Sequence, residues 1–200
     1  MGKLIYLTNT RPDISYVVHC LSQFMHSPLK SHLKTAFKIL RYLKGCTDLG
    51  IHIIKTCRMF LIAFSDADWA NQKQNTLSKS STEAEYRALA SVTSEVIWIL
   101  KILKDIKIEN LLPVNLHCDC NVAIKIAANS VFHKRTKHLE IDLHFVREHI
   151  LKGVVKTVKE DSANQIADIF TKGLDTFQLK GFVEKLGLFD IFQVEIKGGY

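Results

Sequence analysis

Four acidic residues stand at positions that ordinary packing does not explain. Asp66 directly follows the apolar run 59–65, and Asp119 ends a second stretch with the pattern of a strand. Glu85 shares one helical face with apolar residues at spacings of four, three and four, namely Leu89, Val92 and Val96. A carboxylate that faces a core must be paired, protonated or bound to a metal, because an unpaired buried charge is costly. Asp168 lies beside Ile169 and Phe170, and its spacing alone predicts nothing.

Clustered carboxylates indicate a particular chemistry. They can hold two divalent cations ~4 Å apart, an arrangement that stabilises both oxygens of an in-line phosphoryl displacement. Mg²⁺, or Mn²⁺ in its place, prefers such hard oxygen ligands. Two alternatives stay open: Asp119 could instead cap a helix over 121–128, and Cys118 with Cys120 and His117 could suggest zinc. Because a C-x-C spacing without a second pair is a poor zinc template, we interpret these cysteines as structural thiols.

The charge balance indicates an acidic partner. The chain has 200 residues, a formal net charge of +7 and a pI near 9.1. Four cations follow one face of a predicted helix over 30–44, and residues 28–46 contain no Asp or Glu; these cations are Lys30, Lys34, Lys38 and Arg41. A simple solvated face is the alternative, but the imbalance favours contact with phosphates. Nucleic acid is thus expected rather than a membrane, since no apolar run approaches the ~20 residues of a spanning helix.

The pattern of the chain predicts the elements that position these residues. Strands are expected over about 59–65, 113–118 and 154–159, the first covered on both faces because it is nearly all apolar. Helices are expected over 13–26, 30–44, 80–106, 121–128, 138–151 and 163–171, with a further helix in 175–200. The helix over 30–44 has a predicted apolar stripe of Leu29, Leu33, Ala36, Phe37, Leu40 and Leu43. Alternating strands and helices indicate an α/β fold with a three-stranded parallel sheet.

Several long motifs resemble the Pol polyproteins of copia-type retrotransposons. LIYLTNTRPDISYVVHCLSQFMHSP and FKILRYLKG are similar to the segment that follows the polymerase core of these polyproteins. FSDADWA, SKSSTEAEYRALA, HCDCNVAIKIAANSVFHKRTKHLEIDLHFVRE and QIADIFTKGL resemble the ribonuclease H domain after it, and KLGLFDIF resembles the family's terminus. The motifs keep the family's order and span almost the whole chain.

The resemblance implies a fold, an activity and a set of residues. It implies a ribonuclease H-like α/β domain preceded by two helices, which cleaves the RNA strand of an RNA–DNA hybrid with two Mg²⁺ ions. By motif, the metal ligands and catalytic residues are Asp66, Glu85, Asp119 and Asp168. Asp68 and Glu83 are near-misses with local roles, and Asp142 with His144 is the alternative to Asp168 as fourth ligand. No small-molecule cofactor is implied, and the location is intracellular, either cytoplasmic or nuclear.

The chain departs from the family's pattern in two places. CDCN replaces the usual CDNQ, so Cys120 stands where the family has Asn. Between Asp66 and Glu85 the family has a hairpin of two further strands, whereas only residues 67–79 precede the helix here. Thirteen residues reach at most about 43 Å, enough for a loop but not for two strands with their turns. We therefore expect an internal deletion that makes the first strand an exposed edge and leaves hybrid cleavage weak or absent.

These observations predict three segments and leave three functions open. The segments are a helical part over 1–57 that resembles the end of the reverse transcriptase region, a truncated ribonuclease H-like domain over 58–174, and a tail helix over 175–200. No YxDD-type polymerase site, protease motif or paired zinc pattern is present in the sequence. Beside the impaired nuclease, the alternatives are a non-catalytic module that binds nucleic acid or protein, and a decayed reading frame without function.

Overall fold

The computed structural model describes residues 1–51, 59–67, 81–128 and 140–190. The chain divides into two compact units. The first unit comprises Met1–Lys55 together with Asp168–Tyr200, and the second unit comprises Thr56–Ala167. Residues from Asp168 onward therefore group with the N-terminal segment rather than with the α/β part. Each unit is described by itself.

The second unit contains the predicted parallel sheet. Its strands are β2 (Ile62–Ser65), β3 (Val114–Cys118) and β4 (Val155–Lys159), in the order β2-β3-β4. Both neighbouring pairs are parallel, with Ser65 opposite Cys118 and Cys118 opposite Lys159. The prediction of a three-stranded parallel sheet is confirmed. Parallel neighbours require crossovers, which the helices between the strands provide.

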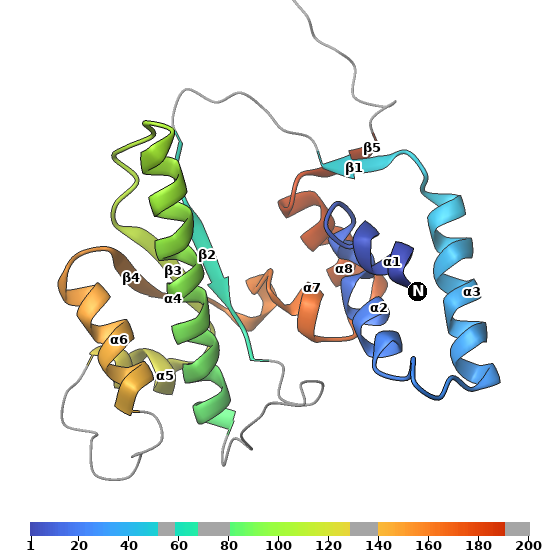
Figure 1. Ribbon diagram of the computed structural model, residues 1–200, viewed down its shortest axis with the longest axis horizontal. Coiled ribbons are helices and arrows are strands. Elements are labelled where there is room, and N and C mark those ends of the chain that lie inside the picture. Colours follow the sequence, from blue (N-terminus) through green and yellow to red (C-terminus); the bar gives the residue numbers. More distant parts are fainter. Residues whose placement is uncertain (52–58, 68–80, 129–139, 191–200) are drawn as a thin grey trace, which may run out of the picture. The chain divides into compact units, whose positions relative to one another are not determined.

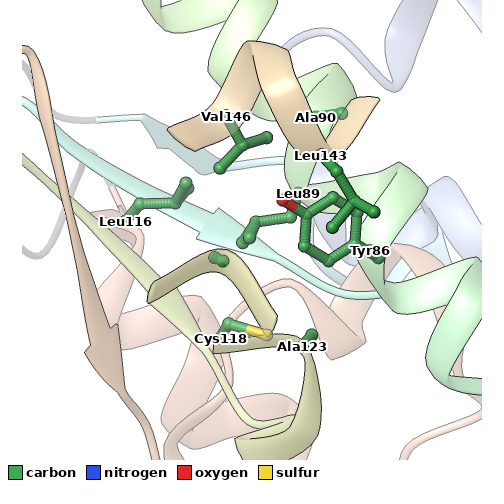
Figure 2. Close-up of a cluster of buried hydrophobic side chains, with 9 residues drawn as sticks. Tyr86, Leu89, Ala90, Leu116, Cys118, Ala123, Leu143 and Val146 are labelled. Atoms are coloured by element: carbon green, nitrogen blue, oxygen red, sulfur yellow. The ribbon is translucent and has the colours of Figure 1, made fainter. Parts of the chain in front are cut away.

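Three helices cover one face of this sheet: α4 (Ser81–Asp105), α5 (Asn121–Ala128) and α6 (Glu140–Leu151) (Figure 1). The alternating residues of β3 that point toward the helices are buried, whereas Asn115 between them is exposed. Side chains of β3 and all three helices form one continuous core (Figure 2): Tyr86, Leu89, Ala90, Leu116, Cys118, Ala123, Ala127, Leu143 and Val146. On α4, Leu89 and Val96 of the predicted stripe are buried, whereas Glu85 and Val92 are half-buried.

The strand β2 differs from its prediction. A strand over 59–65 covered on both faces was expected, but β2 begins only at Ile62, and Met59, Phe60 and Ile62 are 58%, 75% and 42% exposed. Leu61 and Ala63 pack against the core beneath the helices. A nearly continuous apolar run predicts a strand with both faces buried, but this holds only where other elements pack on both faces of the sheet. In the described residues, α4, α5 and α6 pack on one face of this sheet. Within the described residues β2 pairs with β3 alone, so it is the edge strand of the part of the sheet that the structure describes.

We expect this edge to promote self-association. Residues 59–64 carry no charge and no proline, the features that usually protect an edge strand from pairing with another chain. Ile62→Lys places a charge on the exposed side of β2 and should reduce association measured by light scattering. Ile141→Lys, at an 84% exposed position on α6, is the matched control and should change nothing. A monomeric wild-type chain, or equal effects of the two substitutions, would contradict this.

The first unit consists of short helices around a two-stranded sheet. Its elements are α1 (Gly2–Leu7), η1 (Pro12–Ile14), α2 (Ser15–Ser22), α3 (Lys30–Gly45), β1 (Leu49–Ile51), α7 (Asp168–Thr171), α8 (Thr176–Lys185) and β5 (Leu188–Asp190). β1 and β5 pair antiparallel, with Gly50 opposite Phe189. A small core of Ile14, Val18, Leu21 and Ile39 joins η1, α2 and α3. None of the described helices in either unit has the length and apolar character that a membrane span requires.

The predicted apolar stripe of α3 is wrong in part. The residue of α3 that is buried is Ile39, with Ala36 and Leu43 packed beside it. Leu33, Phe37 and Leu40 are instead 57%, 56% and 49% exposed. Periodicity identified the helix, but it could not decide which of two adjacent apolar faces contacts a helix as short as α2.

Three further expectations need correction. The predicted helix over 13–26 is split into η1 and α2, and α2 ends at Ser22. The predicted helix over 163–171 consists of η4 (Ser162–Asn164), which lies in the second unit, and the one-turn α7. The tail expected to be helical over 175–200 has α8 followed by β5, and residues 191–200 lie outside the described part.

Candidate functional site

The carboxyl ends of β2 and β3 bring two of the predicted acids to one edge. Ser65 and Cys118 are paired across the sheet, so Asp66 and Asp119 are the next residue on each strand. Ligand sites of open α/β sheets lie at the carboxyl ends of the strands. Both side chains are half-buried. The sheet register alone therefore places Asp66 and Asp119 at neighbouring strand ends.

Glu85 on α4 reaches the same edge. The ligand atoms of Glu85, Cys118 and Asp119 all lie within 4.8 Å of one another. Glu85 belongs to the first turns of α4, where the buried residues Ala84 and Tyr86 flank it and fix the helix against the core. Two carboxylates this close repel each other unless a cation or a proton lies between them. The pair Glu85 and Asp119 is the geometric centre of the candidate site.

The third member of this group, Cys118, is not suited to a hard cation. Its side chain is fully buried, and burial raises the pKa of the Cys118 thiol to about 12. A neutral thiol is a poor metal ligand, because metals bind the thiolate. The donor set that remains is oxygen alone, with Glu85 and Asp119 beside the strand end of Asp66, and it fits Mg²⁺ or Mn²⁺.

The raised pKa has a direct chemical consequence. In the native protein, Cys118 should not react with iodoacetamide at pH values below its pKa of about 12, whereas half-buried Cys20 should be labelled under the same conditions. Peptide mass spectrometry after labelling distinguishes the two thiols, and labelling in denaturant provides the full signal for Cys118. Equal native labelling of Cys118 and Cys20 would contradict the burial.

The last residue of β4 and the segment after it hold the two strand ends in place. Ser162 Oγ donates a hydrogen bond to Asp119 Oδ2 at 3.2 Å, and Lys159 Nζ donates to the backbone oxygen of Asp119. Gln165, which is fully buried, donates from Nε2 to the backbone oxygen of Ser65 at 2.9 Å. Sequence analysis missed these three residues, since no regular spacing marks a loop that crosses two strand ends.

Two buried polar atoms at this edge are noteworthy. Ser65 Oγ and Gln165 Oε1 have no hydrogen-bond partner among the residues that the structure describes. Buried polar groups in proteins are nearly always satisfied, by water or by a ligand if not by protein. The edge next to Asp66 therefore has unfilled capacity for polar contacts.

The other predicted acids are not members of the group formed by Glu85, Cys118 and Asp119. Asp66 is outside the group formed by Glu85, Cys118 and Asp119. Asp168 opens α7 in the first unit, where its Oδ1 accepts a hydrogen bond from Lys172 Nζ at 2.8 Å. Asp142, the alternative fourth ligand, is a half-buried residue of α6 and is also outside the group, while His144 is exposed. The structure thus joins Glu85 with Asp119, and the roles of Asp66, Asp168 and Asp142 stay predictions.

The predicted cationic face lies on α3 of the first unit. Lys30, Lys34, Lys38 and Arg41 are all exposed. A hollow of roughly 650 Å³ runs along the helix and is lined by Lys34, Phe37, Lys38, Leu40, Arg41 and Lys44. We call these six residues with Lys30 the α3 surface.

Several known proteins similar to this chain are retrotransposon polyproteins. The retrovirus-related Pol polyprotein from transposon RE1 of Arabidopsis thaliana is 39% identical over 212 residues, which cover 94% of this chain. That from transposon RE2 of the same plant is 37% identical and covers 96% of the chain. That from transposon TNT 1-94 of Nicotiana tabacum is 30% identical and covers 86%. The chain belongs to the Pol polyproteins of copia-type retrotransposons.

The chain spans only a small part of the length of these relatives. It spans 14% of the length of the RE1 protein and 15% of the RE2 and TNT 1-94 proteins. No protein-family model matches it, and no solved structure is significantly similar to it.

The alignments also agree with an internal deletion relative to other copia-type Pol polyproteins. About 188 residues of this chain, 94% of 200, are aligned with RE1 over 212 residues, so roughly two dozen residues have no counterpart here. The RE2 alignment, which covers 96% of the chain over 215 residues, has a similar excess. Two strands of about five or six residues with their turns require a segment of this size. Residues 68–80, where the hairpin would lie, are outside the described part of the chain, so the missing hairpin stays a prediction.

Proposed function

We propose that the second unit is a ribonuclease H-like domain that hydrolyses the RNA strand of RNA–DNA hybrids with two divalent cations, at a rate reduced by the missing hairpin. The observation that carries this proposal is the approach of Glu85 and Asp119 to within 4.8 Å at the carboxyl ends of β2 and β3. An oxygen-only donor pair at this place is what a phosphodiester hydrolase with Mg²⁺ requires.

Each residue has a defined task in this proposal. Glu85 and Asp119 would hold one cation between them, and Asp66, at the neighbouring strand end, would hold the other. When bound, the cations would activate a water molecule and stabilise the attacking and leaving oxygens of the phosphate. Ser162 and Lys159 orient Asp119 through their hydrogen bonds, and Gln165 fixes the end of β2 that carries Asp66. Asp168, or alternatively Asp142, would complete the ligand set.

The reduced rate follows from the position of Asp66. Metal ligands must be held to within about half an ångström of their productive positions. Among the described residues, β3 is the one strand that pairs with β2, and Ile62 at the start of β2 is exposed. A ligand at the end of such a strand is less well positioned than one on a central strand.

Product analysis tests the proposed reaction. The chain is incubated with a hybrid labelled on either strand, in Mg²⁺, in Mn²⁺ or in a chelator. We expect slow cleavage of the RNA strand only, and none with the chelator. Cleavage of the DNA strand, or cleavage that persists in the chelator, would exclude this function.

A second candidate is a non-catalytic module that binds nucleic acid, as part of a polyprotein remnant. The α3 surface favours it, because this surface belongs to the first unit and does not depend on the metal site. Salt-sensitive binding without cleavage in any metal would support this alternative over the nuclease.

A further inference from the structure

The exposed apolar residues of the α3 surface are unusual for a helix that binds only a duplex backbone. Phe37 and Leu40 are 56% and 49% exposed, and they line the hollow together with Lys34, Lys38, Arg41 and Lys44. The phosphate backbone of a duplex offers charge to the cations but no apolar surface to these side chains. A ligand that matches the whole surface must carry negative charge for the cations and must also expose an apolar face that can contact Phe37 and Leu40.

The position of Phe37 around the helix is the decisive detail. At 100° per residue, Phe37 lies about 20° from Lys44 and about 40° from Arg41 around the helix axis. Ile39, the buried residue of α3, lies about 160° from Phe37. The phenyl ring therefore stands within the cationic face and not at the margin of the core.

We propose that the α3 surface binds single-stranded nucleic acid, with an unpaired base stacked on Phe37 and the adjoining phosphates held by Lys34, Lys38 and Arg41. The proposal rests on the nucleic-acid binding proposed above and specifies its ligand. Aromatic rings placed among cations are the usual means of binding unpaired bases without sequence preference.

The charge of α3 supports the same ligand. Residues 28–46 include no acidic residue, and Lys30, Lys34, Lys38, Arg41 and Lys44 are all exposed. The cations recur at spacings of three and four residues and so form a continuous row along the helix. Such a row can contact several successive phosphates of a polyanion at once, whereas a ligand with a single charged group would contact only part of it.

The test compares ligands and variants by fluorescence anisotropy. The full chain is titrated into labelled oligo(dT) and into a hairpin duplex with the same number of phosphates. We expect tighter binding to oligo(dT), and both affinities should fall as salt rises. Phe37→Ala should weaken binding to oligo(dT) by roughly 5- to 100-fold and leave duplex binding unchanged.

Two substitutions separate stacking from loss of apolar area or of folding. Phe37→Trp should retain the affinity, whereas Phe37→Leu, which keeps apolar area without a ring, should lose it as Phe37→Ala does. Phe177→Ala is the matched control, since Phe177 is 88% exposed on α8 of the same unit. It should have no effect.

The possible failures are distinguishable. Wild-type affinity in Phe37→Leu, or equal binding of duplex and oligo(dT), overturns the stacking inference while general nucleic-acid binding stands. No binding to either oligonucleotide, with binding to phosphatidylserine vesicles instead, overturns both proposals and assigns the surface to a membrane.

Discussion

Replacing Asp13 by alanine is expected to lower the free energy of unfolding of the first unit by about 3–5 kcal/mol. The side chain of Asp13 is fully buried and forms two hydrogen bonds with Arg11, at 2.9 Å to Nε and 2.8 Å to Nη2. Tyr42 donates a third hydrogen bond to the same carboxylate at 2.9 Å. Without Asp13, the guanidinium stays buried with no countercharge, and the cost of that burial is no longer offset.

This network connects the start of the first unit to the end of α3. Arg11 also donates to the backbone oxygen and the sulfur of Cys46, both at 2.9 Å. Burial raises the pKa of the Tyr42 phenol, and the hydrogen bond to Asp13 raises it further. Asp13 thus holds Arg11 and Tyr42 together, which explains why its loss should be costly.

The measurement must distinguish the two units. Both tryptophans, Trp69 and Trp98, belong to the second unit, so their fluorescence follows that unit. Hydrogen exchange of amides in α2 and α3 follows the first unit, and Asp13→Ala should accelerate it there. The matched control is Glu148→Ala, which removes the exposed ion pair with Lys152 and should have no measurable effect. Equal stability of the two variants would show that the buried network contributes little.

The second large effect concerns the proposed metal site. Glu85→Gln should weaken Mn²⁺ binding by at least tenfold, because it removes one of the two carboxylates that lie within 4.8 Å. In the absence of metal, the same substitution should not destabilise the second unit, since it relieves repulsion with Asp119. Addition of Mg²⁺ should therefore raise the unfolding midpoint of the wild-type chain but not that of Glu85→Gln.

Glu83→Gln is the matched control for this experiment. Glu83 lies two residues earlier on the same helix and forms an ion pair with Arg87 at 2.9 Å. It should retain Mn²⁺ binding, which calorimetry or electron paramagnetic resonance would measure. If Glu83→Gln weakened binding as much as Glu85→Gln, the effect would come from the charge of the helix and not from a specific site.

The long helices and the parallel sheet could be predicted from sequence, because their patterns are local. The bounds of α3, α4 and α6 agree with prediction to within about two residues, since each helix repeats its apolar spacing over several turns. The alternation of β3 likewise predicted which side chains face the helices.

The elements that sequence did not predict depend on distant partners. β1 and β5 have three residues each, too few for a pattern, and they pair residues 49–51 with residues 188–190. The single covered face of β2 depends on which neighbours are present, and the exposure of Phe37 depends on how α3 packs on α2. In the site, the motifs and the position of Glu85 on its helix indicated the carboxylates, whereas Gln165 and Ser162 act through a loop without periodicity.

The central claim is that the acids at the strand ends form a metal-dependent nuclease site. Single-turnover cleavage of an RNA–DNA hybrid in Mg²⁺, by the wild-type chain and by Asp66→Asn, tests it most directly. We predict slow cleavage by the wild-type chain, well below the rate of a copia ribonuclease H domain with a complete sheet, and no cleavage by Asp66→Asn. Equal rates for the wild-type chain and Asp66→Asn would contradict the claim that these acids catalyse hydrolysis. A wild-type rate equal to that of the complete domain would contradict the impairment assigned to the missing hairpin.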